Sequence, residues 1–156
     1  MAGKISSLLS PDRIALNLSG SDRAAALKAT ASLLEGHPDI ANFDGFYAEL
    51  LARDRLDTTC LGNGVALPHA RTAHVKRIVM AVGRYDAGLP FDASGEIVKL
   101  IFVLGTPKSK PGEYLATMSA LCKVLRDSVD RNALLSANTP EAFIAAVSAA
   151  EAKIMR

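Results

Sequence analysis

Residues 97–104 read Ile-Val-Lys-Leu-Ile-Phe-Val-Leu, a run that is apolar nearly throughout. A strand with one face in water would alternate apolar and polar side chains, so this run predicts a β-strand that is covered on both faces. A second apolar run, residues 78–82, precedes it across a segment with Gly88, Pro90 and Gly95 that is predicted to be a loop. The two runs therefore predict buried strands of one sheet.

Helical patterns surround these strands. Apolar residues three and four apart predict a helix capped by Ser21, a second capped by Asn42, and further helices from Gly112 onward, the last capped by Thr139. Short strands are expected at residues 15–18 and 65–67. Because a helix pair separates the first strand from the second, a purely alternating parallel sheet is not expected. The pattern predicts an α/β fold, a three-layer domain with a mixed β-sheet and helices on both faces.

The composition indicates one globular domain over residues 1–156. The chain is 49% hydrophobic, which is enough apolar content to bury a core without disulfides. Its 18 basic and 16 acidic residues give a formal net charge of +2, which indicates neither a nucleic-acid nor a membrane-surface partner. Cys60 and Cys122 are too far apart for a metal-site motif, and no window has the roughly 18 continuous apolar residues of a membrane span. We therefore expect a cytoplasmic protein without membrane insertion.

The three histidines have different surroundings in the sequence. His37 lies between a glycine and a proline, where a histidine most often interacts with the C-terminal end of a helix. His74 lies in a basic stretch, residues 71–77, that is predicted to be a solvated connection. His69 instead closes the apolar segment 65–67 behind a glycine-rich turn, so its ring should stand at a strand end where backbone N–H groups cluster.

A histidine at a strand end can carry a phosphoryl group. The group needs a neutral imidazole in a fixed orientation, donors for its oxygens and a cation against its charge. The sequence supplies candidates nearby, namely two glycines that allow close backbone approach, two hydroxyls and a guanidinium: Gly62, Gly64, Thr58, Thr59, and Arg53 or Arg55. A hairpin whose terminal histidine is merely hydrogen-bonded would explain the same spacing equally well.

The segment 59–69, Thr-Cys-Leu-Gly-Asn-Gly-Val-Ala-Leu-Pro-His, resembles the active-site signature of the mannitol/fructose-type enzyme IIA proteins of the phosphoenolpyruvate-dependent phosphotransferase system. Its Gly-Asn-Gly is closest to the nitrogen-regulatory branch of that family. The resemblance extends from an Ile-Ser-Ser-Leu-Leu opening at residue 5 to the final helix after Thr-Pro-Glu. Residues 51–54 resemble the family's Arg-Glu pair, and residues 91–92 resemble its Phe-Asp loop.

The resemblance implies a phosphotransferase component with a phosphohistidine intermediate. His69 would receive the phosphoryl group from an HPr-type phosphocarrier protein, and Arg53 would steady the phosphate. The expected phosphate-binding residues around it are Thr59, Gly62, Asn63 and Gly64. No metal or other cofactor is expected, because transfer between two imidazoles depends mainly on positioning and charge stabilisation.

One departure from the family lies at Tyr114, which stands where members commonly carry a second histidine at a helix start. A tyrosine hydroxyl can donate to a phosphate oxygen, but its pKa of about 10 prevents proton sharing near neutral pH. Onward transfer is therefore expected to be weakened. Three functions follow as expectations: a phosphocarrier in nitrogen-related regulation, a fructose/mannitol-type IIA component that passes phosphate to a IIB partner, or a regulatory binding module that does not transfer.

Overall fold

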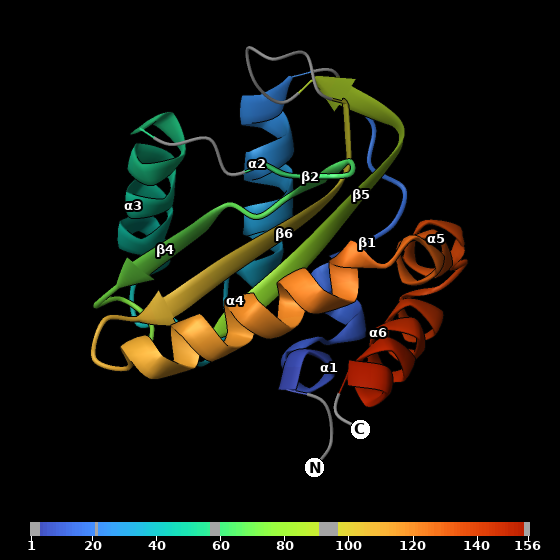
Figure 1. The fold of residues 1–156 in the computed structure, drawn as a ribbon. Helices are drawn as coiled ribbons and strands as arrows, with labels where there is room; N and C mark the ends of the chain where they lie inside the picture. The colour runs from blue at the N-terminus through green and yellow to red at the C-terminus, as the bar shows by residue number, and fades with distance from the viewer. Residues whose placement is uncertain (1–3, 21, 57–59, 91–96, 155–156) are drawn as a thin grey trace.

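The computed structural model describes residues 4–20, 22–56, 60–90 and 97–154. Within them the strands form one mixed sheet in the order β1-β5-β6-β3-β2, with β4 also paired to β6 (Figure 1). Their bounds are β1 Ile14–Ala15, β2 Cys60–Gly62, β3 Val65–Ala66, β4 His69–Thr72, β5 Val79–Pro90 and β6 Ile97–Pro107. The β5–β6 and β2–β3 pairs are antiparallel, whereas β1 lies parallel to β5, and β3 and β4 lie parallel to β6. The predicted mixed sheet is confirmed.

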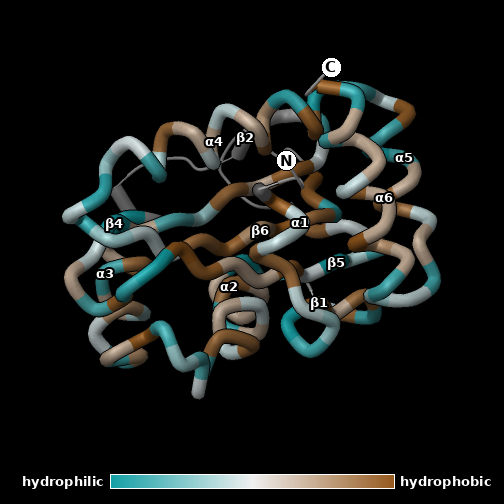
Figure 2. The backbone as a smooth tube through the Cα atoms, turned by 90° about the horizontal axis from the view of Figure 1, so that it is seen from below, coloured by the Kyte–Doolittle hydropathy of each residue, from teal (hydrophilic) through white to brown (hydrophobic). Residues whose placement is uncertain are grey.

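Helices cover both faces of this sheet, as predicted. Their bounds are α1 Lys4–Leu8, α2 Arg23–Ala31, α3 Phe43–Leu56, α4 Pro111–Arg126, α5 Ser128–Ser136 and α6 Pro140–Ile154, with short 3-10 turns η1 Pro11–Arg13 and η2 Ser32–Leu34. Seen along the sheet in Figure 2, α2 and α3 lie on one side, and α1, α4, α5 and α6 lie on the other. No helix in the described ranges is long and apolar enough to cross a membrane.

The central position of β6 in the sheet explains why its sequence is apolar nearly throughout. Leu100, Phe102 and Leu104 point into the core beneath α4, α5 and α6, while Ile101 and Val103 point into the core beneath α2 and α3. All five side chains are at most 1% exposed. Successive side chains of a strand face opposite ways, so the part of a strand that lies between two helical layers is apolar on both faces, and the exposed Lys99 lies outside that part.

The strand β5 is longer than the sequence predicted. It continues through Gly88 to Pro90, where a loop was expected, with a shift of register against β6 between Arg84 and Leu89. Gly88 has φ +75°, a conformation that favours glycine, and an irregularity of this kind lets a strand bend without ending. The predicted loop is therefore wrong up to Pro90, and Gly95 lies outside the described residues.

Several helix ends have the predicted caps. The side chain of Asn42 accepts from the N–H of Gly45 at 3.0 Å, and that of Thr139 accepts from the N–H of Ala142 at 3.0 Å. The cap of α2 is Asp22, since Ser21 lies outside the described residues.

The two ends of the chain are joined by a buried carboxylate on α6. Glu151, which is 2% exposed, accepts from the N–H of Ile5 at 2.7 Å and from the N–H of Ser6 at 2.9 Å. Because these amides lie in the first turn of α1, where no carbonyl of the helix can accept from them, the carboxylate supplies partners that they would otherwise lack. Glu151 thereby fixes α1 against α6.

Candidate functional site

His69 is the first residue of β4, not the last residue of the strand before it, as the sequence had suggested. Strands β3 and β4 run along β6 in one unbroken register, with Ala66 opposite Ile101 and His69 opposite Leu104. The N–H of Leu104 donates to the carbonyl of Pro68 at 3.0 Å and bridges the two strands. His69 therefore stands in the middle of an extended segment rather than at its end.

The alternation of side chains along this segment directs His69 toward α4. Val65 and Leu67 belong to the core beneath α4, whereas Ala66 and Ala70 belong to the core beneath α2 and α3. Residue 69 shares the face of residues 65 and 67, because side chains two apart lie on one side of a strand. The ring is half-buried, which leaves it accessible to another protein.

Two hydrogen bonds orient the imidazole of His69. Its Nδ1 lies 2.8 Å from the carbonyl oxygen of Leu67, and its Nε2 lies 3.2 Å from the hydroxyl oxygen of Tyr114. A carbonyl can only accept, so the first contact places the proton of the neutral ring on Nδ1 and the lone pair on Nε2. The Tyr114 hydroxyl then donates to that lone pair. The two contacts fix the orientation of the ring, with Nδ1 toward Leu67 and Nε2 toward Tyr114.

Tyr114 comes from the first turns of α4, and Arg71 lies over its ring. The guanidinium carbon of Arg71 is 5.4 Å from the Tyr114 ring centroid, and the His69 and Tyr114 centroids are 5.6 Å apart. Arg71 follows His69 by two residues and so occupies the same face of β4. The sequence assigned Arg71 to a solvated connection, which is wrong because residues 71 and 72 pair with β6. Its two-residue spacing from His69 is the signal that could have indicated its place.

Arg53 lies on α3, which packs along the outer strand β4. Near the start of the helix, Gly45 lies against the ring of His74, since a Cβ atom placed on Gly45 would be 2.6 Å from His74 Nε2. One turn later, Glu49 Oε2 accepts from Thr72 Oγ1 at 2.9 Å and lies 3.1 Å from His74 Nε2. The helix therefore runs antiparallel to β4, so the next turn carries Arg53 toward the His69 end of the strand. The Arg53 side chain is exposed.

The glycine-rich turn expected to bind phosphate lies at the other end of the extended segment from His69. Asn63 and Gly64 have φ of 60° and 78° and make the tight turn between β2 and β3. Since the chain is extended from there to His69, the five residues 65–69 at about 3.3 Å each span about 16 Å. By this estimate Asn63 and Gly64 lie about one strand length from the ring, and the phosphate-binding role of Gly62, Asn63 and Gly64 stays a prediction. Thr59, with Thr58, lies outside the described residues, as do residues 91–92.

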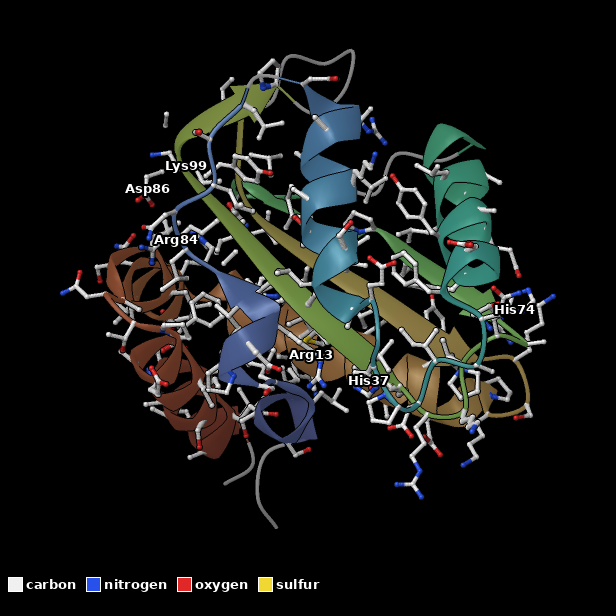
Figure 3. All side chains as sticks on the ribbon, turned by 180° about the vertical axis from the view of Figure 1, so that it is seen from behind. Arg13, His37, His74, Arg84, Asp86 and Lys99 are labelled. Carbon is white, nitrogen blue, oxygen red and sulfur yellow. The ribbon has the colours of Figure 1, made fainter. Side chains whose placement is uncertain are left out.

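The other two histidines have structural partners. His74 lies beside Glu49 on α3 and is well separated from His37 (Figure 3). His37 Nδ1 accepts from the N–H of Asp39 at 3.0 Å. Burial, together with the nearby charge of Arg13, lowers the pKa of His37. Both observations favour a neutral His37.

The fold is thus a mixed sheet between two helical layers, and it holds a half-buried histidine whose ring is fixed by two hydrogen bonds. Residues 7–150 match the sequence model of the family described as "Phosphoenolpyruvate-dependent sugar phosphotransferase system, EIIA 2". The match covers most of the chain, so the protein belongs to this enzyme IIA family and is a component of the phosphotransferase system.

Its similarities include both branches of the family. The chain is 32% identical over 143 residues to the nitrogen regulatory protein of Pseudomonas aeruginosa, covering 90% of this chain and 92% of that protein. It is 31% identical over 111 residues to a fructose-like EIIA component of Escherichia coli, covering 70% and 75%. Its fold is similar to that of the nitrogen regulatory protein IIA-Ntr of Neisseria meningitidis, with a TM-score of 0.83, 28% identity, and coverage of 92% and 98%.

Proposed function

We propose that His69 accepts a phosphoryl group on Nε2 from an HPr-type phosphocarrier protein. The observation that carries the proposal is the contact between Nδ1 and the carbonyl of Leu67, which leaves the lone pair on the nitrogen that faces Tyr114. Half-burial supports the same role, because the donor's phosphoryl group must reach the ring. The proposed location is the cytoplasm, since the two widely spaced cysteines fit a reducing compartment.

The transfer exchanges one nitrogen–phosphorus bond for another. The lone pair of His69 Nε2 attacks phosphorus while the bond to the donor's imidazole breaks, and the donor recovers its electron pair. The His69 ring gains positive charge as it does so, and the Leu67 carbonyl stabilises that charge through the proton on Nδ1. No proton needs to leave the ring during the step.

Tyr114 must change partners when the phosphoryl group arrives. Its hydroxyl occupies the direction of the Nε2 lone pair at 3.2 Å, which is where phosphorus approaches. Once displaced, the hydroxyl donates to a phosphoryl oxygen instead. Arg71, over the Tyr114 ring, and Arg53, from α3, are the cations proposed to offset the charge of the group.

We propose nitrogen-related regulation as the purpose of this carrier. Support comes from the similarity to the Pseudomonas aeruginosa nitrogen regulatory protein over nearly the full length of both chains. A phosphoryl group adds nearly two negative charges at one point of the surface, which is enough to make or break a contact with a regulated protein. The similarity to a fructose-like EIIA component favours the second candidate, in which the group passes to a IIB partner.

The test is the intact mass of the protein after incubation with phosphoenolpyruvate, enzyme I and an HPr-type carrier. We expect one acid-labile phosphoryl group on the wild type and none on the His69→Ala variant. His37→Ala is the matched control, since it removes a histidine elsewhere, and it should label like the wild type. An unlabelled wild type that still binds the carrier would support the non-transferring module instead.

A second incubation separates the two transferring functions. Labelled protein is mixed with a IIB protein that carries a reactive cysteine. Loss of label from His69 together with a gain on the IIB protein would favour sugar uptake. Retention of the label over the same time would favour regulation.

A further inference from the structure

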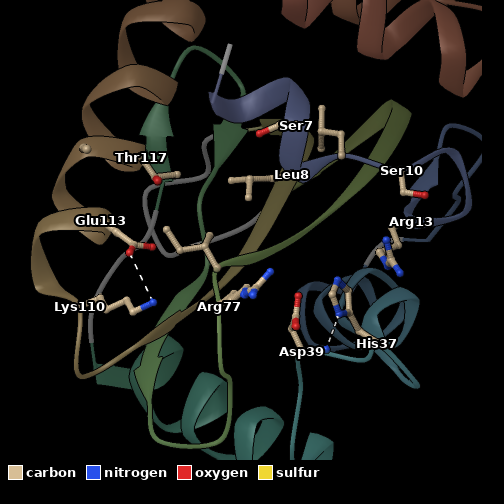
Figure 4. Close-up of a pocket in the computed structure, with 13 residues that line it drawn as sticks. Ser7, Leu8, Ser10, Arg13, His37, Asp39, Arg77, Lys110, Glu113 and Thr117 are labelled. Carbon is tan, nitrogen blue, oxygen red and sulfur yellow. Dashed lines mark hydrogen bonds and ion pairs between the residues drawn. The ribbon is translucent and has the colours of Figure 1, made fainter. Parts of the chain in front are cut away.

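A cleft that does not include His69 lies between α1 and the N-terminal end of α4. It has a volume of about 950 Å³ and is bordered by α1, η1, the loop after η2, the segment before β5 and the first turns of α4 (Figure 4). A volume of this size is within the range of small-molecule sites. Lys110, just before α4, and Glu113 and Thr117 on α4 line the cleft, whereas Tyr114 contacts His69.

The charges in the cleft are only partly compensated. It contains the cations Arg13, Arg77 and Lys110 and the carboxylates of Asp39 and Glu113. Lys110 lies 3.8 Å from Glu113, so these two charges offset one another. Neither Arg13 nor Arg77 has a carboxylate within ion-pair distance anywhere in the described ranges. Arg13, Arg77 and the Asp39 carboxylate then remain, so the cleft keeps a net charge of +1 and can attract an anion through its two guanidinium groups.

His37 adds a neutral donor beside Arg13. Because Nδ1 accepts from the N–H of Asp39, the neutral ring carries its proton on Nε2. Figures 3 and 4 show His37 next to Arg13. Figure 4 shows Arg77 reaching toward the cleft from the segment before β5. The cleft thus offers two guanidinium groups and an imidazole N–H from three separate segments of the chain.

Apolar side chains complete the lining. Leu8, Leu9, Ile78 and Ala116 border the same space as the charged groups. Inorganic phosphate would use only the cationic part, whereas a ligand with an organic portion would also contact these side chains. The separate positions of Arg13 and Arg77 suit a ligand with more than one anionic group.

We propose that this cleft binds a small organic phosphate that carries at least two anionic groups, of about nucleotide size. Arg13 and Arg77 hold the anionic groups, His37 donates to one of their oxygens, and the apolar side chains contact the organic portion. The ligand also touches the first turns of α4, the helix that presents Tyr114 to His69. The site is independent of the proposed phosphorylation.

The test is isothermal titration of the intact protein with inorganic phosphate, pyrophosphate and ATP at low ionic strength. We expect saturable binding of pyrophosphate and ATP, tighter than that of inorganic phosphate, and tightest for ATP. Arg13→Gln and Arg77→Gln should each weaken binding about tenfold, because each removes one charge-assisted contact worth about 1.4 kcal/mol. Lys99→Gln is the control, since it removes one exposed charge far from Arg13 (Figure 3).

Each alternative result overturns the proposal. Absence of saturable binding would exclude the site, and an equal loss in Lys99→Gln would show that only net charge matters. Equal affinity for inorganic phosphate and pyrophosphate would remove the requirement for two anionic groups. Amide chemical shifts locate the ligand: changes at residues 37–39 and 77–78 are expected, whereas changes confined to His69 and its neighbours would place the anion in the phosphorylation site. Matching circular dichroism spectra verify that each variant is folded.

Discussion

The replacement Tyr114→Phe isolates the contribution of one hydroxyl to phosphoryl transfer. It keeps the ring beneath Arg71 and removes the oxygen that lies 3.2 Å from His69 Nε2. In the resting protein the loss is one neutral hydrogen bond, worth about 1 kcal/mol. In the transferring state the loss is a charge-assisted bond to a phosphoryl oxygen, worth about 1.5–3 kcal/mol. The difference raises the barrier by about 0.5–2 kcal/mol, which slows phosphorylation by about 2- to 30-fold.

The assay is a rapid-quench single turnover with the phosphorylated HPr-type carrier in limiting amount, followed by quantification of acid-labile phosphate. Tyr47→Phe is the matched control, because Tyr47 lies on α3 and its loss should leave the rate unchanged. A Tyr114→Phe protein that is phosphorylated as fast as the wild type, or faster, would refute the reasoning. The hydroxyl would then only block Nε2, and would contribute nothing once the phosphoryl group has arrived.

Three further predictions concern stability. Arg84 is 6% exposed and donates from Nη1 to two backbone carbonyls around the end of α5, at 2.9 and 2.8 Å. Arg84→Met should therefore lower the free energy of unfolding, measured in urea, by about 2–4 kcal/mol. An unchanged unfolding midpoint would mean that water replaces the guanidinium. Glu151→Gln removes one of the two oxygens that accept from α1, so it should lower the free energy of unfolding by about 1–2 kcal/mol and speed amide hydrogen exchange in α1. Unaltered exchange would contradict the role of Glu151 in anchoring α1. The pKa of His37 lies below its ordinary value of 6.5, chiefly through burial, so the unfolded chain binds more protons than the folded one and stability should fall as pH drops below 6.5. In urea titrations, His37→Gln should flatten this dependence of stability on pH. An equal slope in both proteins would refute the assignment.

The layered fold could be predicted because its main signals are local. Residues 97–104 are apolar except for Lys99, and such a run is typical of a strand with helices on both faces, so the sequence already indicates a three-layer domain. Asn63 and Gly64 predict a tight turn, because that turn requires positive φ at both positions. The caps at Asn42 and Thr139 could be predicted for the same reason: each depends on a side chain and an amide three residues away.

The extent of β5 could not be predicted from its residues alone. Gly88 and Pro90 ordinarily indicate a loop, and in an isolated segment that would be the better prediction. In the folded chain β6 continues beside them, and an irregular register accommodates Gly88 at φ +75°. Pairing of Leu89 with Val98 and of Pro90 with Ile97 decided the outcome, and the residues from Gly88 to Pro90 do not by themselves indicate that pairing.

The sequence by itself determined that His69 is the distinctive histidine and that Arg53 and Tyr114 are the residues to examine with it, partly through resemblance to the enzyme IIA family. Only the tertiary structure decided which groups meet. The extended run from Gly64 along β6 carries the glycine turn about 16 Å from the ring, and the packing of α4 over β4 brings Tyr114 and Arg71 together beside His69. These contacts depend on strand register and helix packing between distant segments, which no local pattern of residues encodes.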